Sequence, residues 1–288
     1  MNSKINASPT KEFFIDMLTR DIALDRSLLD LIDNSVDAAR QNNKHSAWIK
    51  IDYIDGVFTI HDNCGGMDKN SALNYAFRFG RPKNNPITPN SVGQFGVGMK
   101  RTLFKLGKKF QVLSKKDNEF FSINIDVDEW KTDDNDWTFN IDVDTSIDLS
   151  DGETKIIVSD IYPDISQQLR LNTFMNSLSQ EISIAHFKSI NAGLDIYIND
   201  EKVSKYEISF LESQELGIYS KSYTFDGVNI RITAGISERK LDEGGWYIVC
   251  NGRLVESAEQ SRITGWQVDG VPKYHPDYAF FRGVVEFD

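Results

Sequence analysis

The stretch that most constrains this chain is an acidic helix predicted over residues 28–39, Leu-Leu-Asp-Leu-Ile-Asp-Asn-Ser-Val-Asp-Ala-Ala. Apolar and small side chains recur at helical spacing, so we expect a buried stripe of Leu28, Leu31, Ile32, Ser35 and Ala39. The remaining surface is then expected to carry Asp30, Asp33, Asn34 and Asp37. Because Asp30 and Asn34 are four residues apart, they project from one face and can hold a water and a hard cation. The stretch predicts metal-phosphate chemistry or, as the alternative, a solvated acidic face.

Composition narrows the class of protein. The 288 residues suggest one large or two ordinary domains, and the formal net charge of -11 argues against a surface that holds nucleic acid or anionic membrane non-specifically. The two cysteines, Cys64 and Cys250, have neither metal-ligand spacing nor a framework of pairs, which favours a reducing compartment. The polar N-terminus and the lack of a long apolar stretch predict a cytoplasmic protein with no membrane partner.

A second motif follows a predicted strand over residues 57–60. It reads His61-Asp62-Asn63-Cys64-Gly65-Gly66-Met67. The Asp62 carboxylate can accept a hydrogen bond from the exocyclic amine of adenine, and the residues up to Gly66 and Met67 let backbone approach a flat ligand. Standing alone, the motif would be read as a strand followed by a glycine-rich turn.

A third motif, over residues 91–100, has three glycines before a predicted helix. Backbone N–H groups at such a place can wrap phosphates, and a lysine adds positive charge. The residues expected at the phosphates are Gly93, Gly96 and Gly98, and the added charge is that of Lys100. The polar segment 80–90 before them is read as a lid or a loop. Alone, this motif could be an ordinary tight turn.

Together the motifs resemble, in order, the nucleotide-binding boxes of the GHKL ATPases, the superfamily of gyrase B subunits, ninety-kilodalton heat-shock chaperones, histidine kinases and MutL-type repair proteins. Asp30 stands where the family usually has Glu as the base that activates water, and Asn34 matches its magnesium ligand. Cys64 replaces the first glycine of the second box. The resemblance implies ATP and Mg²⁺ as cofactors, with nucleotide contacts from Asn34, Asp37, Asp62, Gly66, Met67, Gly93, Gln94, Phe95, Gly96, Val97, Gly98, Lys100 and Thr154. Thr154 would support Asp62 through its hydroxyl and a water.

The expected fold class is α+β. We expect a Bergerat-type α/β sandwich, with a mixed, largely antiparallel sheet and a helical layer, over residues 1–187, and an S5-like α/β transducer domain over 188–288. Helices are predicted over 8–20, 69–79 and 164–187, and strands over 47–53, 57–60, 110–114, 120–127, 137–143, 152–158, 194–200, 229–234 and 245–250. Phe79-Gly80-Arg81 and Asn251-Gly252-Arg253 are similar to segments of MORC-type and chaperone-like ATPases.

The resemblance implies a hydrolase that works as an ATP-driven conformational switch. ATP would bring two N-terminal domains together as a homodimer that clamps a macromolecular partner, a protein or DNA. Two alternatives stay open: a nucleotide-sensing regulatory module without productive hydrolysis, motivated by Asp30, and an ATP-gated DNA-binding clamp. A histidine kinase is disfavoured by the transducer-like second half.

The last residues, 280–288, form a predicted apolar strand with no cap, turn or polar tail, which suggests a fragment truncated in its second domain. In the resembling families a lysine beyond this strand reaches the γ-phosphate. We therefore expect this chain to bind ATP, to be mostly monomeric without nucleotide, and to hydrolyse ATP roughly a hundredfold more slowly than a longer chain. Steady-state turnover of both chains from the same gene measures this, and equal rates would contradict it.

Overall fold

The computed structural model describes residues 5, 7–80, 96–143 and 148–287. Contacts among these residues divide the chain into two units. Unit 1 comprises the described residues up to 80 together with 96–179 and 193–203. Unit 2 comprises residues 180–192 and 204–287.

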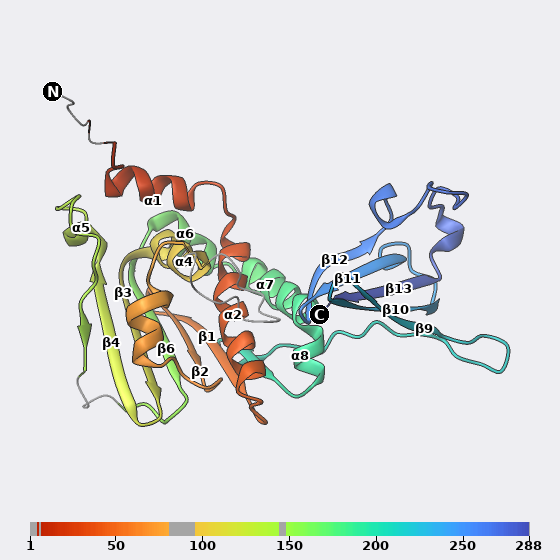
Figure 1. Cartoon of the computed structure of the whole chain (residues 1–288), viewed down its shortest axis with the longest axis horizontal. Coiled ribbons are helices and arrows are strands. Elements are labelled where there is room, and N and C mark those ends of the chain that lie inside the picture. Colours follow the sequence, from red (N-terminus) through yellow and green to blue (C-terminus); the bar gives the residue numbers. More distant parts are fainter. Residues whose placement is uncertain (1–4, 6, 81–95, 144–147, 288) are drawn as a thin grey trace. The chain divides into compact units, whose positions relative to one another are not determined.

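An eight-stranded sheet forms the base of unit 1, with the order β5-β4-β3-β6-β2-β1-β7-β8 (Figure 1). Every neighbouring pair is antiparallel except β1 and β7, which are parallel. The strands are β1 (Trp48–Ile54), β2 (Val57–Asp62), β3 (Gly107–Lys116), β4 (Glu119–Asp126), β5 (Ile141–Asp142), β6 (Thr154–Ile161), β7 (Asp195–Ile198) and β8 (Glu201–Lys202). The expected mixed, largely antiparallel sheet is confirmed.

Side chains alternate between the two faces of this sheet, and the apolar ones gather on one face. Ile51, Ile60, Ile156 and Val112 lie side by side on four neighbouring strands, and all four are buried. On β2 the same alternation ends at Asp62, which is also buried. The buried face of the sheet therefore leads directly to the second motif.

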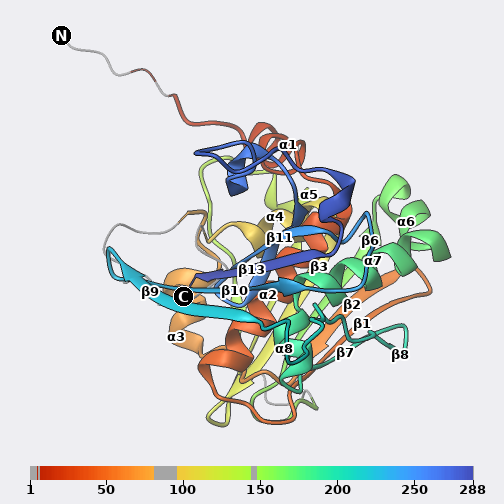
Figure 2. The same cartoon turned by 90° about the vertical axis from the view of Figure 1, so that its right-hand side faces the viewer.

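Helices form the second layer of unit 1. They are α1 (Lys11–Thr19), α2 (Leu24–Gln41), α3 (Lys69–Ser71), η1 (Ala72–Ala76), α4 (Gly98–Leu106), α5 (Val127–Trp130), α6 (Pro163–Leu169) and α7 (Asn172–Ala185), whose last residues belong to unit 2. Helices α2 and α4 lie side by side (Figures 1 and 2). The buried hydroxyl of Thr102 in α4 donates to the carbonyl of Ser27 in α2, at 2.6 Å. This bond fixes the helices relative to each other within the expected α/β sandwich.

An aromatic cluster attaches α1 to unit 1. Phe14 packs edge-on against Phe79, with ring centroids 4.8 Å apart, and against Trp137. The Lys11 ammonium is buried, lies 4.1 Å from the centre of the Trp130 ring and donates to the Trp130 carbonyl at 2.5 Å. The predicted helix over 8–20 thus packs within unit 1 through an apolar cluster and one buried cation.

Three predicted elements differ from the structure. The helix predicted over 69–79 is divided into α3 and the π-helix η1, which ends at Ala76. The strand predicted over 137–143 is reduced to β5, because Asp136 accepts hydrogen bonds from the backbone N–H and hydroxyl of Thr138. Such local bonds compete with a sheet ladder. The helix predicted over 164–187 is divided into α6, α7 and α8 (Phe187–Asn191), since the chain leaves helical geometry near Leu171 and again at His186, the N-cap of α8.

Unit 2 contains a five-stranded sheet with the order β12-β11-β13-β10-β9. Its elements are α8, β9 (Tyr219–Phe225), β10 (Val228–Ile236), β11 (Gly245–Cys250), β12 (Arg253–Glu259), η2 (Arg262–Thr264), η3 (Pro276–Tyr278) and β13 (Phe281–Phe287). Tyr247, Val249, Leu254 and Val284 form its core, against which Phe187 packs. The hairpin between β11 and β12 turns at Asn251-Gly252, both with positive φ, as Asn-Gly turns require.

The structure does not divide at a single cut after residue 187. The strand predicted over 194–200, which we expected to open the second domain, is β7 and pairs with β1 from Trp48↔Asp195 to Ile51↔Ile198. Its alternating pattern predicted a strand correctly, but pattern alone cannot tell which sheet a strand joins. Residues 193–203 therefore belong to unit 1, and 180–187 to unit 2.

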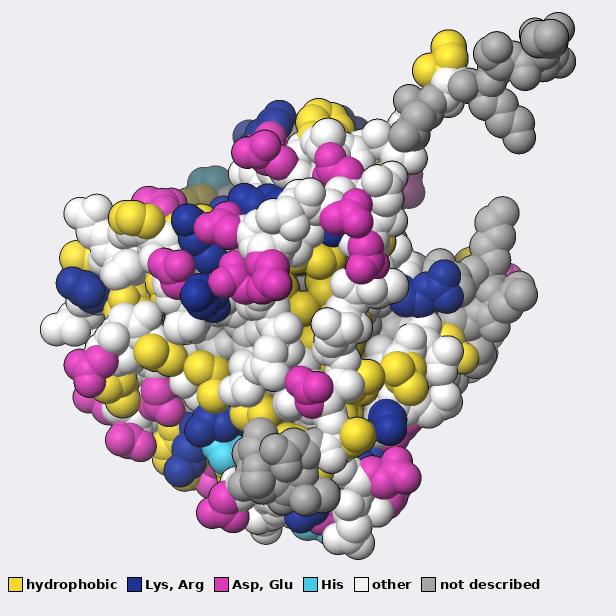
Figure 3. Space-filling model, turned by 90° about the vertical axis from the view of Figure 1, so that its left-hand side faces the viewer, with side chains coloured by type: hydrophobic (Ala, Val, Ile, Leu, Met, Phe, Trp, Pro, Cys, Tyr) yellow, Lys and Arg dark blue, Asp and Glu magenta, His cyan; other side chains and the backbone are white. Residues whose placement is uncertain are grey.

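Acidic and basic side chains are interspersed on the face of the molecule shown in Figure 3, rather than gathered into one continuous basic surface. This distribution agrees with the net charge of -11. Within the described ranges, no helix combines the length and the apolar composition that crossing a bilayer needs.

Candidate functional site

Asp62 is the buried carboxylate of the candidate site, with 6% of its surface exposed at the end of β2. Its Oδ1 accepts a hydrogen bond from the Cys64 backbone N–H at 2.9 Å, and its Oδ2 accepts one from the Ser35 hydroxyl at 2.8 Å. Burial raises the pKa of Asp62, and these two hydrogen bonds oppose that rise. A carboxylate has about four lone-pair sites, so a further donor such as an adenine amine can still be accepted.

The loop after Asp62 is closely packed at its two glycines. A Cβ on Gly65 would lie 2.1 Å from the Asn42 side chain, and one on Gly66 would lie 2.3 Å from the Lys115 carbonyl oxygen. Both glycines have positive φ, 132° and 67°. Only glycine therefore fits at these positions, and the backbone continues to Met67, whose N–H donates to the Ser114 hydroxyl at 2.7 Å.

Thr154 lies directly opposite Asp62 on the neighbouring strand β6. Its hydroxyl is 2.8 Å from the Ser114 hydroxyl, which also receives the Met67 N–H. The predicted support of Asp62 by Thr154 through a water stays a prediction, but the structure brings both residues to the same end of the sheet.

Helix α2 carries the first motif, and the predicted buried stripe is confirmed. The expectation that Asp33 and Asp37 lie on the exposed surface is wrong, since their exposed fractions are 3% and 6%. The buried surface of α2 is wider than one stripe because the helix packs against both α4 and the sheet. A nucleotide contact from Asp37 stays a prediction.

Asn34 is exposed on α2, and its amide N–H donates to the carbonyl of Asp30 one turn earlier, at 2.8 Å. This bond uses the amide nitrogen, so the amide oxygen of this exposed residue stays available to a hard cation. Among the described residues, no group of three or more His, Cys, Asp or Glu side chains could hold a metal ion. A single amide oxygen fits Mg²⁺ because this ion keeps several waters and takes its other ligands from phosphates.

The described part of the third motif begins at Gly96, which has a φ of 66° and precedes Val97, the N-cap of α4. Gly98 is the first residue of α4, so backbone N–H groups of its first turn have no partner within the helix. A Cβ on Gly98 would lie 3.2 Å from the Asp30 carboxylate oxygen Oδ2. The first and third motifs thus meet in space. Three predicted residues of this loop, Gly93, Gln94 and Phe95, lie outside the described residues.

Lys100 is buried, and its ammonium donates to the Ala76 carbonyl in η1 at 2.5 Å. Burial lowers the pKa of Lys100 to about 8. The structure thus gives this ammonium a partner within the protein, and the predicted contact of Lys100 with phosphate stays a prediction.

Three residues of the site were missed by sequence reasoning. Ser35 was placed in the apolar stripe, although a hydroxyl there signals a buried polar partner, which is Asp62. Ser114 gave no signal within its strand. Arg101 follows Lys100 directly and forms an ion pair with Asp30, with 2.5 Å between Nη2 and Oδ2.

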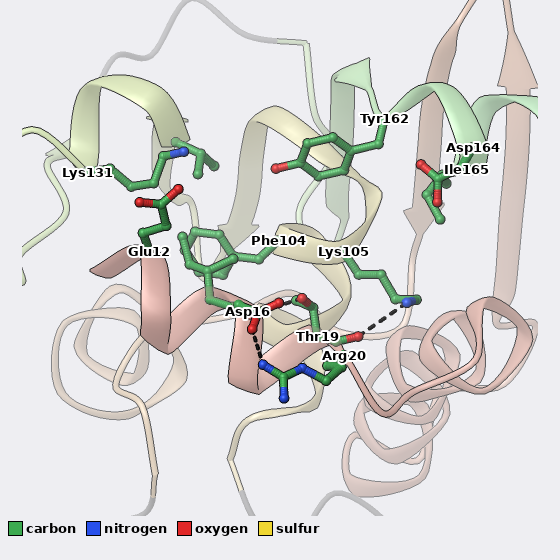
Figure 4. A pocket seen from close by; sticks show the side chains of 12 residues that line it. Glu12, Asp16, Thr19, Arg20, Phe104, Lys105, Lys131, Tyr162, Asp164 and Ile165 are labelled. Atoms are coloured by element: carbon green, nitrogen blue, oxygen red, sulfur yellow. Dashed lines mark hydrogen bonds and ion pairs between the residues drawn. The ribbon is translucent and has the colours of Figure 1, made fainter. Parts of the chain in front are cut away.

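A pocket of about 390 Å³ lies beside α1, the last turns of α4 and the start of α6 (Figure 4). Four of its lining residues contact one another, since Lys105 donates to the Thr19 carbonyl at 3.2 Å and Asp16 pairs with Arg20. No predicted site residue is among the described residues that line it. The pocket is therefore separate from the candidate site.

Comparison with known proteins supports a nucleotide-binding site in this region. Residues 22–153 match the family model described as "Histidine kinase-, DNA gyrase B-, and HSP90-like ATPase". This region contains α2, the loop around Asp62 and α4, and the match supports the GHKL superfamily and an ATPase-type function. A search among curated proteins found no match.

We expect Asp62→Asn to weaken ATP binding about tenfold or more without lowering the free energy of unfolding. The amide can still accept from Cys64 and can donate to the rotated Ser35 hydroxyl, and it removes a buried charge, but it weakens the acceptor for the adenine amine. Calorimetric titration with ATP and urea unfolding measure the two effects.

Asp52→Asn is the matched control, because Asp52 lies on the neighbouring strand β1 and alternation places it on the other face of the sheet. It removes the same charge and should leave ATP binding unchanged. Undiminished binding by Asp62→Asn would exclude Asp62 from the adenine site.

We expect Lys100 to make stability rise with pH between about 8 and 10.5. In this range the unfolded chain still holds the proton that the folded chain has lost, so raising the pH favours folding, by up to about 3 kcal/mol. The free energy of unfolding of Lys100→Met should not rise across this range. At pH 7 the variant should be at least as stable as the wild type. Parallel pH profiles for both proteins would contradict it.

Proposed function

We propose that this chain is a GHKL-type ATP-binding protein that slowly hydrolyses ATP and works as a conformational switch. One observation carries the proposal: the Asp30 carboxylate lies against Gly98, at the start of the helix that follows the glycine loop. A base candidate and a phosphate-binding helix terminus are thus adjacent, within the region that matches the ATPase family.

Three groups of unit 1 would bind the nucleotide in this proposal. Asp62 would accept the adenine amine, the backbone around Gly96 and Gly98 would donate to phosphate oxygens, and Asn34 would hold Mg²⁺. When bound, Mg²⁺ supplies positive charge that neutralises the phosphates. The arrangement is supported by the burial and double hydrogen bonding of Asp62 and by the exposure of Asn34, whose amide nitrogen rather than its oxygen bonds to the Asp30 carbonyl.

Asp30 would act as the general base. The oxygen of a water bonds to the γ-phosphorus as the bond from that phosphorus to the bridging oxygen breaks. The water gives its proton to the Asp30 carboxylate, and the electron pair of the broken bond leaves with ADP. Replacing the usual Glu by Asp shortens the side chain by roughly 1.5 Å, and a base must lie within hydrogen-bond reach of its water, so slow turnover is expected.

Unit 2 would act as the S5-like transducer of a MORC-like or chaperone-like ATPase. Its mixed five-stranded sheet and the Asn251-Gly252 hairpin support this part of the proposal. ATP would promote homodimerisation of the N-terminal domains, which would clamp a macromolecular partner in the cytoplasm. The formal net charge of -11 does not favour DNA as that partner.

A second candidate is a nucleotide-sensing module that binds ATP without productive hydrolysis. The ion pair between Asp30 and Arg101 favours it, because the guanidinium occupies Oδ2, one of the two carboxylate oxygens that could accept a hydrogen bond from a water. The two candidates differ in turnover, not in binding.

We expect Asp30→Asn to bind ATP within about threefold of the wild-type affinity and to lose turnover by about a hundredfold, since an amide cannot take the proton. Calorimetry gives the affinity, and phosphate release under saturating ATP gives kcat. Turnover equal to that of the wild type would assign the base to another residue. A wild type that binds ATP but releases no phosphate would establish the sensing module instead.

A further inference from the structure

We propose that Arg101 is a positioning residue that holds Asp30 where it can activate the attacking water. The inference rests on the proposed ATP hydrolysis. It assigns a role to a residue outside the predicted set of nucleotide ligands.

The ion pair joins residues that are 71 positions apart in sequence, Asp30 on α2 and Arg101 in the first turn of α4. Arg101 Nη2 and Asp30 Oδ2 are 2.5 Å apart, and both side chains are largely but not fully buried, with 31% and 22% exposed. Partial burial weakens screening by solvent and salt, so this contact constrains the carboxylate more than an exposed pair would.

The backbone that carries Arg101 is itself fixed. The Arg101 N–H donates to the Val97 carbonyl at 2.9 Å, and the next residue, Thr102, is anchored to the Ser27 carbonyl of α2. Ser27 and Asp30 are three residues apart on α2, so the two contacts lie one turn from each other. Arg101 therefore approaches Asp30 from a rigid position, as a residue that orients another side chain must.

The ion pair uses one side of the carboxylate only. Among the described residues, Asp30 Oδ2 is the oxygen that is bound, and Gly98 packs against the same oxygen. The second oxygen is left for a water. Asp has one fewer methylene than Glu, so its carboxylate extends less far toward the attacking water. The position of this carboxylate therefore depends on the group that holds it.

The guanidinium also has spare donor capacity. Its Nε is buried and has no hydrogen-bond acceptor among the residues that the structure describes. A neutral amide at this position could not supply the same charge-assisted bond to Asp30, whereas a lysine could restore the charge but not the planar fork.

Arg101→Gln and Arg101→Lys test this role, with phosphate release under saturating ATP giving kcat and calorimetry giving the affinities for ATP and for ADP. Misplacing the base by about 1 Å is worth roughly a hundredfold, so we expect Arg101→Gln to lower kcat by about tenfold to a hundredfold. Its affinities for both nucleotides should stay within about threefold, and Arg101→Lys should recover most of the turnover.

Arg20→Gln is the matched control, because Arg20 also pairs with an aspartate, Asp16, but on exposed α1. It should leave kcat and both affinities unchanged. Thermal unfolding of all three variants checks that the fold is retained, and Arg101→Lys keeps the test valid if Arg101→Gln is unstable.

Each outcome separates this role from the proposed function. Unchanged turnover in Arg101→Gln would refute the positioning role alone. A selective loss of ATP affinity, with ADP affinity retained, would make Arg101 a phosphate ligand and also refute it. A wild type that binds no ATP would refute the proposed function, and one that binds ATP without releasing phosphate would refute both.

Discussion

Helix α2 is held from two sides, and the geometry of the candidate site depends on that. On one side, Ser35 donates to Asp62 at the end of β2; on the other, Thr102 donates to the Ser27 carbonyl. The residues proposed for base and metal, Asp30 and Asn34, lie on the same helix between these attachments. A shift of α2 would therefore move the proposed base, the proposed metal ligand and Ser35, which holds the Asp62 carboxylate, all together. Misplacements of about 1 Å are enough to slow an enzyme.

Buried polar groups at the site lower the stability of the fold, but they hold their polar atoms at fixed positions. Desolvation raises the pKa of Asp62 and lowers that of Lys100, so in both cases burial opposes the charged form. Asp62 offsets part of this cost with two hydrogen bonds, and Lys100 with one to the Ala76 carbonyl. Such unfavourable burial is common where a protein needs a polar group at a fixed place.

Sequence patterns predicted the parts of this structure that depend on local order. The buried stripe of α2 and the strands β1 to β4 and β6 follow from periodicity. Contacts between distant elements could not be predicted in this way. The pairing of β7 with β1, the burial of Asp33 and Asp37, and the approach of Arg101 to Asp30 depend on packing, which a single sequence does not display.

The loop after Asp62 also indicates which substitutions its backbone can accommodate. Gly65 and Gly66 have positive φ and no room for a Cβ, so a residue with a side chain does not fit at either position. Cys64 has no positive φ, and its side chain is accommodated in the interior, with Sγ 3.8 Å from the Trp48 carbonyl oxygen. A residue with a side chain therefore fits at position 64, whereas any side chain at position 65 or 66 would strain the loop.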